Sequence, residues 1–117
     1  MNIGKVGTLG EDAVVKHLKK HKYRIVERNY VSRFGEIDII AKNKEFLLFV
    51  EVKTRKENSQ ISGINAVDSK KQQKMILTAE YYLTNNETNL QPRFDVAEVT
   101  YAQNNKKLQI NYIENAF

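Results

Sequence analysis

The sequence predicts an α/β domain in which a central mixed β-sheet is flanked by helices. Segments with helical and with strand periodicity follow one another along the chain. One predicted hairpin is apolar on both faces except at one end, which requires a sheet covered on both sides. A length of 117 residues with 41% hydrophobic and 28% charged side chains is ordinary for a globular domain, so we expect residues 1–117 to form a single domain.

Two helices are predicted where apolar residues recur at helical spacing. The first spans Thr8–His21, and its lysines lie opposite the apolar stripe. Thr8 followed by Glu11 fits a capping box at the start of this helix, which gives that carboxylate a structural use. The second spans Ser69–Asn85, and its expected apolar face consists of Met75, Ile76, Ala79, Tyr82 and Leu83.

Five strands are predicted from apolar and β-branched runs bounded by turn residues, namely Tyr23–Tyr30, Gly35–Ala41, Phe46–Arg55, Pro92–Tyr101 and Leu108–Ile113. Residues Lys42–Glu45 form the expected hairpin turn, and Asn104-Asn105 the turn before the last strand. Lys56–Asn65 is polar and is predicted to be a mobile loop. Arg93 and Asp95 are expected to form a structural ion pair.

The hairpin between the second and third predicted strands carries the most informative charges. Alternation places Glu36 and Asp38 on one face, which matches the face of Glu51 and Lys53 on the next strand. If the turn centres on Asn43-Lys44, Glu36 lies opposite Glu51, and Asp38 lies diagonal to Glu51 at roughly 7 Å or less. The other face of the first of these strands is expected to be apolar and to hold Ile37, Ile39 and Ala41.

Crowded carboxylates require a compensating charge. Two of them about 5 Å apart repel by roughly 3 kcal/mol at an effective dielectric near 20. Lys53 offsets part of this repulsion, and a divalent cation offsets all of it. Oxygen donors without cysteine or a histidine cluster favour Mg²⁺ or Mn²⁺ over zinc. Such a cation held by Asp38 and Glu51 suits phosphodiester hydrolysis, with Lys53 orienting the attacking water or stabilising the transition state; solvated strand ends with Glu–Lys pairs are the alternative interpretation.

The positive charge is concentrated in one region. Residues 1–34 contain eight basic and three acidic side chains, which accounts for the whole net charge of +5. This distribution favours a polyanionic partner, nucleic acid first, although a solvated helix face is the alternative. The sequence has no membrane-spanning stretch, no signal peptide and no cysteine. We therefore expect a cytoplasmic protein without a membrane partner.

Four motifs of the chain are Gly-Glu-Ile-Asp-Ile-Ile-Ala (35–41), Phe-Val-Glu-Val-Lys-Thr-Arg (49–55), Arg-Phe-Asp-Val (93–96) and Asn-Ala-Phe (115–117). Together they closely resemble the motifs of the YraN-like family of uncharacterised bacterial proteins. The resemblance covers nearly the whole chain, including Gly10-Glu11 and Lys71. That family is similar in turn to the PD-(D/E)xK nuclease superfamily, and its pattern is nearest to archaeal Holliday-junction resolvases.

The resemblance implies a restriction-endonuclease-like core and a Mg²⁺-dependent phosphodiesterase site. Asp38 matches the first acid of the motif, Glu51 the second and Lys53 the lysine. Glu11 matches the carboxylate of the first helix. Ile37 stands before Asp38, where the superfamily's name has proline.

Four further cationic side chains are predicted to contact phosphates. Lys71 lies at the margin of the apolar stripe of its helix, from which it can lean toward the sheet, whereas Lys74 lies opposite the stripe. Arg33 and Arg55 flank the carboxylate end of the hairpin. Solvated side chains are the alternative for the lysines.

We therefore predict an endonuclease that uses Mg²⁺ or Mn²⁺ and acts on DNA, including branched or structured DNA. Its metal-site carboxylates are Glu11, Asp38 and Glu51, and its catalytic lysine is Lys53. One alternative is a non-catalytic nucleic-acid-binding module on a nuclease-like scaffold, and another is an interaction protein whose basic charge serves solubility. By analogy with junction resolvases, which cut two strands symmetrically, we expect a homodimer.

Overall fold

The computed structural model describes residues 3–56, 67–101 and 108–117, with the backbone alone for residues 3–7. The elements follow the predicted order and are α1 (Ile3–Lys20), β1 (Arg24–Ser32), β2 (Gly35–Lys42), β3 (Phe46–Lys56), α2 (Ser69–Asn85), β4 (Gln91–Tyr101) and β5 (Leu108–Ile113). The strands form one sheet in the order β1-β2-β3-β4-β5, in which β3 and β4 are parallel and the other pairs antiparallel. The predicted α/β class with a central mixed sheet is confirmed, and α2 lies in the crossover that the parallel pair requires.

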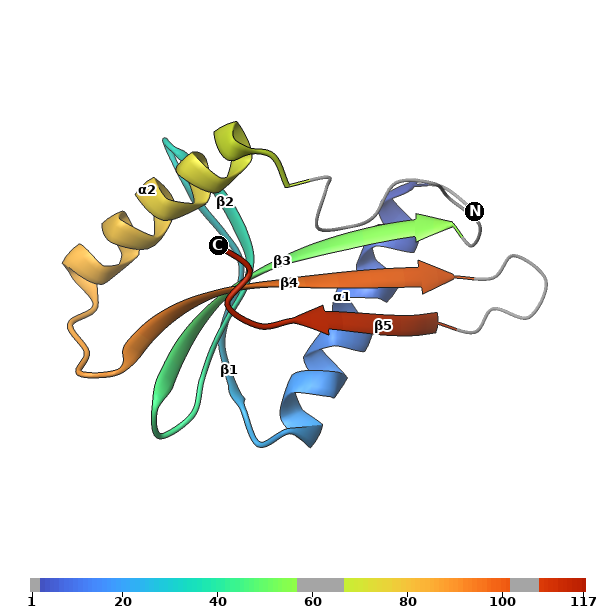
Figure 1. Ribbon diagram of the computed structural model, residues 1–117, viewed down its shortest axis with the longest axis horizontal. Coiled ribbons are helices and arrows are strands. Elements are labelled where there is room, and N and C mark those ends of the chain that lie inside the picture. Colours follow the sequence, from blue (N-terminus) through green and yellow to red (C-terminus); the bar gives the residue numbers. More distant parts are fainter. Residues whose placement is uncertain (1–2, 57–66, 102–107) are drawn as a thin grey trace.

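The two helices cover opposite faces of the sheet, with α1 behind the strands and α2 in front of them in Figure 1. The core on the α1 side contains Val14, Leu18, Ile39, Ala41, Leu48, Val50, Ala97 and Val99. The core on the α2 side contains Ile37, Ile40, Leu47, Phe49, Ala79 and Tyr82. This double coverage explains why β2 and β3 are apolar on both faces.

Helix α1 begins earlier than its apolar pattern indicates. It starts at Ile3, so Thr8 lies inside the helix and the capping box expected for Thr8 and Glu11 is wrong. Three glycines, at positions 4, 7 and 10, obscure this start because each disfavours a helix by about 1 kcal/mol relative to alanine.

The C-terminus of α1 is closed by a Schellman motif. The backbone N–H of Tyr23 donates to the carbonyl of Leu18 at 2.9 Å, and that of Lys22 donates to the carbonyl of Lys19 at 3.0 Å. Lys22 occupies the left-handed position of this motif, with φ 69, where glycine is the usual residue.

The β2–β3 turn is built by the side chain of Asn43. Its Oδ1 accepts the backbone N–H groups of Glu45 at 2.9 Å and Phe46 at 2.7 Å. The strand pairing resumes at Lys42 opposite Leu47, so the turn is centred beyond Asn43-Lys44 and the predicted register is wrong. The observed register, continued from its last pair, places Asp38 directly opposite Glu51 instead of diagonal to it.

The side-chain alternation of β2 fails at Asp38. Ile37 joins the core on the α2 side while Ile39 joins that on the α1 side, so the prediction that these two residues share a face is wrong. The β1–β2 register places Asn29 opposite Asp38, and Asn29 has a left-handed backbone with φ 53. The regular pleat is therefore interrupted in both strands at the level of Asp38.

Helix α2 has the predicted bounds and a slightly different buried face. Asp68 caps its N-terminus, because the Asp68 carboxylate accepts the backbone N–H of Lys71 at 2.9 Å. Its buried residues are Met75, Thr78, Ala79 and Tyr82. Ile76 is 37% exposed, so its predicted place on the buried face is wrong.

The predicted ion pair of Arg93 and Asp95 is confirmed. The Nε and Nη2 atoms of Arg93 donate to the two carboxylate oxygens of Asp95, each at 2.9 Å. Asp95 also accepts the hydroxyl of Tyr112 at 2.6 Å and the backbone N–H of Asn115 at 2.9 Å. This network ties β4 to β5 and to the residues that follow it.

Two predicted segments lie outside the described residues. They are the loop over Lys56–Asn65, apart from Lys56 itself, and the turn at Asn104-Asn105. Neither α1 nor α2, as far as their residues are described, is long and apolar enough to cross a membrane.

Candidate active site

Glu51 lies at the centre of the candidate site, on β3. Its side chain is only 5% exposed, and the Nζ atoms of Lys53 and Lys71 each lie 3.4 Å from its Oε1. Lys53 comes from the same strand, whereas Lys71 reaches across from α2. The Oε2 of Glu51 is buried and accepts no hydrogen bond within the described part of the chain. A buried carboxylate oxygen without a donor is uncommon and fits a position that receives a cation.

Asp38 is the carboxylate across the strand from Glu51. Its Oδ2 accepts the backbone N–H of Val52 at 2.8 Å, which fixes the side chain against β3. The pKa of the Asp38 carboxyl is raised to about 7, chiefly by burial and then by the negative charge of Glu51, while the hydrogen bond from Val52 opposes both effects. The two acids therefore repel each other in a poorly hydrated position.

Glu11 stands at the edge of this pair, on α1. Its Oε1 accepts hydrogen bonds from the Nδ2 of Asn29 at 3.2 Å and from the Nη2 of Arg28 at 3.3 Å. Its charge contributes to the raised pKa of Asp38, which places it within electrostatic reach of the site. The side chain of Glu11 is thus held by β1 in this arrangement.

The carboxylates do not form a complete chelating cluster. Within the described ranges, no three side chains of the His, Asp or Glu type are grouped so that they could hold a metal ion. Asp38 and Glu51 nevertheless suit a hard divalent cation, because both supply oxygen donors and one oxygen of Glu51 lacks a partner. Glu11, the third ligand expected from the sequence, accepts hydrogen bonds from Arg28 and Asn29 in this structure.

The predicted phosphate-binding residues are spread over the site and its surroundings. Lys71 lies beside the buried glutamate, as its place on the helix face indicates. Arg55 forms an ion pair with Glu98, which lies beside it on β4. Arg33 is exposed and lies over the adjacent phenylalanine ring at 4.8 Å, and Lys74 is exposed on α2. The structure therefore brings Lys71 to the carboxylate of Glu51, and the contacts described for Arg33 and Arg55 are with other residues.

Sequence reasoning missed two residues at this site. Glu98 is only 4% exposed and pairs in register with Lys53 of the neighbouring strand. Its signal in the sequence is an acidic residue inside an otherwise apolar run of β4. Asn29 was missed as well, and its only local signal is that asparagine tolerates a left-handed backbone better than most residues.

Comparison with known proteins gives a consistent assignment. A family model described as "Uncharacterised protein family UPF0102" matches residues 10–99. A UPF0102 protein of Clostridium acetobutylicum is 42% identical over 97% of this chain and 93% of its own length. UPF0102 proteins of Caldicellulosiruptor saccharolyticus and Dictyoglomus turgidum are 41% and 37% identical, each over the full length of both chains.

Proposed function

The chain belongs to the uncharacterised protein family UPF0102, as its motifs imply, and we propose that it is a metal-dependent endonuclease that hydrolyses phosphodiester bonds in DNA. The observation that carries this proposal is the environment of Glu51. This buried carboxylate faces Asp38, has two ammonium groups at 3.4 Å, and keeps one oxygen without a hydrogen-bond partner. The large majority of buried polar atoms have a hydrogen-bond partner, so the unpartnered Oε2 supports a position that a cation can occupy.

Asp38 and Glu51 would hold a Mg²⁺ or Mn²⁺ ion, with Glu11 added if its side chain exchanges Arg28 for the cation. When bound, the ion supplies Lewis-acid polarisation of a phosphate oxygen and a lowered pKa for a coordinated water. The hydrogen bond from Val52 to Asp38 keeps the Asp38 carboxylate aimed across the strand pair, so one of the two donors is already oriented.

The two lysines have separate tasks in this proposal. Lys53 lies on the sheet beside Glu51, where its ammonium can orient the attacking water or stabilise negative charge on the phosphate. Lys71 approaches from α2 on the other side and binds a non-bridging phosphate oxygen. Both side chains are about one-third exposed, at 33% and 37%, so a nucleic acid can reach them.

The test is cleavage of linear, flap, single-stranded and four-way-junction DNA by the purified protein, with Mn²⁺, Mg²⁺ or a chelator. We expect cleavage of at least one substrate that depends on the metal. Asp38→Asn and Glu51→Gln should lower this cleavage by at least about 100-fold, because each removes one charged ligand. Glu36→Gln is the matched control, since Glu36 is an exposed carboxylate of the same strand, and it should retain activity.

Contaminating nucleases are excluded by Lys53→Ala, which should lose cleavage while it keeps its fold and its DNA affinity within a few-fold. Undiminished cleavage by both Asp38→Asn and Glu51→Gln would contradict the proposal. Metal-independent binding of DNA without any cleavage would favour the alternative, a nucleic-acid-binding module on a nuclease-like scaffold.

A further inference from the structure

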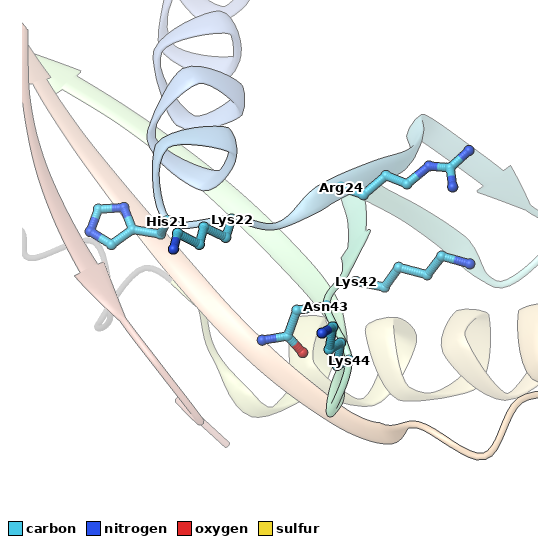
Figure 2. Close-up of a pocket in the computed structure, with 6 residues that line it drawn as sticks. All are labelled: His21, Lys22, Arg24, Lys42, Asn43 and Lys44. Atoms are coloured by element: carbon cyan, nitrogen blue, oxygen red, sulfur yellow. The ribbon is translucent and has the colours of Figure 1, made fainter.

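A second concentration of positive charge lies at the other end of β2, away from the carboxylates. It is a cavity of about 580 Å³, and we call it the basic pocket. Its lining residues are His21, Lys22, Arg24, Lys42, Asn43 and Lys44 (Figure 2). Four of the six are permanently cationic and none is acidic, so the pocket fits an anion.

Three separate segments build the basic pocket: the end of α1, the start of β1 and the β2–β3 turn (Figure 2). The turn is rigid at this point, because the Oδ1 of Asn43 is occupied by two backbone N–H groups. Its amide nitrogen is left as a donor, and Figure 2 shows it on the side that faces His21. The ring of His21 is fixed as well, since its Nδ1 donates to the carbonyl of His17 at 2.8 Å.

Lys22 provides a separate indication of function. It has φ 69 at the Schellman position of α1, where glycine fits without strain and a side chain does not. A lysine in this conformation destabilises the fold slightly, and strained residues of this kind concentrate at functional sites. Lys22 thus places a positive charge at the pocket although the local backbone favours glycine.

The shape and composition of the pocket favour nucleic acid over a lipid surface. None of the exposed large apolar side chains of the described chain lines the pocket, so it offers nothing to insert into a bilayer. From Asp38 to Lys42 the strand rises about 13 Å, which equals about four base-pair steps of duplex DNA. A duplex whose scissile phosphate is at the carboxylates therefore has backbone phosphates at the distance of the pocket.

We propose that the basic pocket binds the sugar–phosphate backbone of DNA, about four base pairs from the carboxylate site. This inference rests on the proposed function in taking DNA as the ligand, but it does not require cleavage. The pocket sets where the duplex lies, while the carboxylates act on the phosphodiester bond.

The test is the binding of a fluorescein-labelled 24-base-pair duplex, measured by anisotropy in EDTA between about 50 and 200 mM salt. The double variant Lys42→Gln with Lys44→Gln should weaken binding about tenfold and lower the salt slope by about 2. Lys16→Gln with Lys19→Gln is the matched control, because it removes the same charge from exposed positions of α1 outside the pocket. We expect it to change the affinity less than about twofold.

Lys22→Gly separates binding from folding. It should weaken DNA binding about threefold and yet raise the melting temperature by a few degrees, because glycine relieves the left-handed backbone. Loss of affinity through unfolding would lower the melting temperature instead.

Equal weakening by the two double variants, or no DNA binding by the wild-type protein, would overturn the pocket proposal. Pocket variants that lose binding to phosphatidylserine vesicles but keep their affinity for DNA would overturn it in favour of a membrane. A wild-type protein that binds DNA through the pocket but never cleaves it refutes only the endonuclease. If the wild-type protein cleaves DNA but the Lys42→Gln, Lys44→Gln variant binds DNA as tightly as the wild type, only the proposal for the basic pocket is refuted.

Discussion

Asp38 shows how a single carboxyl links stability to function. Its pKa of about 7 in the folded protein lies above the value near 3.9 of an unfolded chain, chiefly because of burial. Between these values the folded state binds more protons than the unfolded state, so the free energy of unfolding falls as pH rises from about 4 to about 7. Above pH 7 the ionised carboxylate leaves the fold less stable than a neutral side chain would.

Asp38→Asn is therefore expected to stabilise the metal-free protein at pH 8 by about 1–2 kcal/mol. The amide oxygen of asparagine can still accept the backbone N–H of Val52, while the repulsion from Glu51 disappears. At pH 4 the folded state already carries a neutral Asp38, so the two proteins should differ much less. Urea unfolding in EDTA at both pH values measures the effect, and a destabilised variant at pH 8 would contradict it.

At the scale of the elements, the contact between α1 and β3 sets the position of Glu11. Gly10 lies against Thr54, and a Cβ built at Gly10 would collide with the Thr54 hydroxyl. The absence of a side chain thus allows α1 to approach the sheet at the residue next to Glu11. In the Gly10-Glu11 pair, the glycine thus allows the close packing of the helix and the glutamate supplies a carboxylate to the site.

Gly10→Ala is expected to lower the free energy of unfolding by about 1 kcal/mol, although alanine favours a helix. The loss should disappear in a Thr54→Ala background, because the colliding hydroxyl is gone and only ordinary contact with the Cβ remains. Thermal and urea unfolding of the two single variants and the double variant give the coupling directly. A Gly10→Ala protein that is more stable than wild type would show that the helix approaches the sheet less closely.

The elements were largely predictable from the sequence, because buried strands and helices carry their periodicity locally. The spacing of Glu51 and Lys53 placed both side chains on one strand face, and the helical phase of Lys71 directed it toward them. The strand register was not predictable, since the Asn43 side chain replaces a backbone partner inside the turn. The kink at Asp38 depends on the left-handed Asn29 of another strand, which no local pattern indicates.

The hydrogen-bond and ion-pair partners of the site carboxylates could not be predicted from the sequence either. Arg28 and Asn29 of β1 hold the Glu11 carboxylate of α1, a pairing that the sequence does not indicate, and the predicted metal-binding role of Glu11 stays a prediction. Long-range pairing of this kind depends on how two elements pack, and the charges alone allow several partners. The metal-binding, catalytic and DNA-binding roles of the residues stay predictions.

At the scale of the whole molecule, the hydrogen bonds of Asp95 connect β4 to β5 and to the residues after β5. Asp95 is fully buried and, among the residues that the structure describes, accepts hydrogen bonds from Arg93, Tyr112 and Asn115. Burial of Tyr112 and, after it, the charge of Asp95 raise the pKa of the Tyr112 hydroxyl, so this group remains a donor over the ordinary pH range.

Asp95→Asn should destabilise the protein by about 3 kcal/mol, because it leaves the buried guanidinium of Arg93 with only the exposed carboxylate of Glu114, at 3.8 Å, as a counter-charge. Tyr112→Phe removes one hydrogen bond of the same carboxylate and is expected to lose only about 1 kcal/mol. Urea unfolding followed by circular dichroism compares the two. Equal losses would mean that the ion pair contributes no more than a neutral hydrogen bond.

The order of the strands in the sheet, which repeats their order along the chain, has a kinetic consequence. The entropic barrier to closing a loop grows with the length of chain enclosed. The β1–β2 and β2–β3 hairpins enclose only short turns, whereas joining β3 to β4 encloses the whole α2 segment. During folding, the β1–β2–β3 meander is therefore expected to form early, and the β4–β5 hairpin is expected to dock onto it later. The carboxylate pair of Asp38 and Glu51 belongs to the part that forms first.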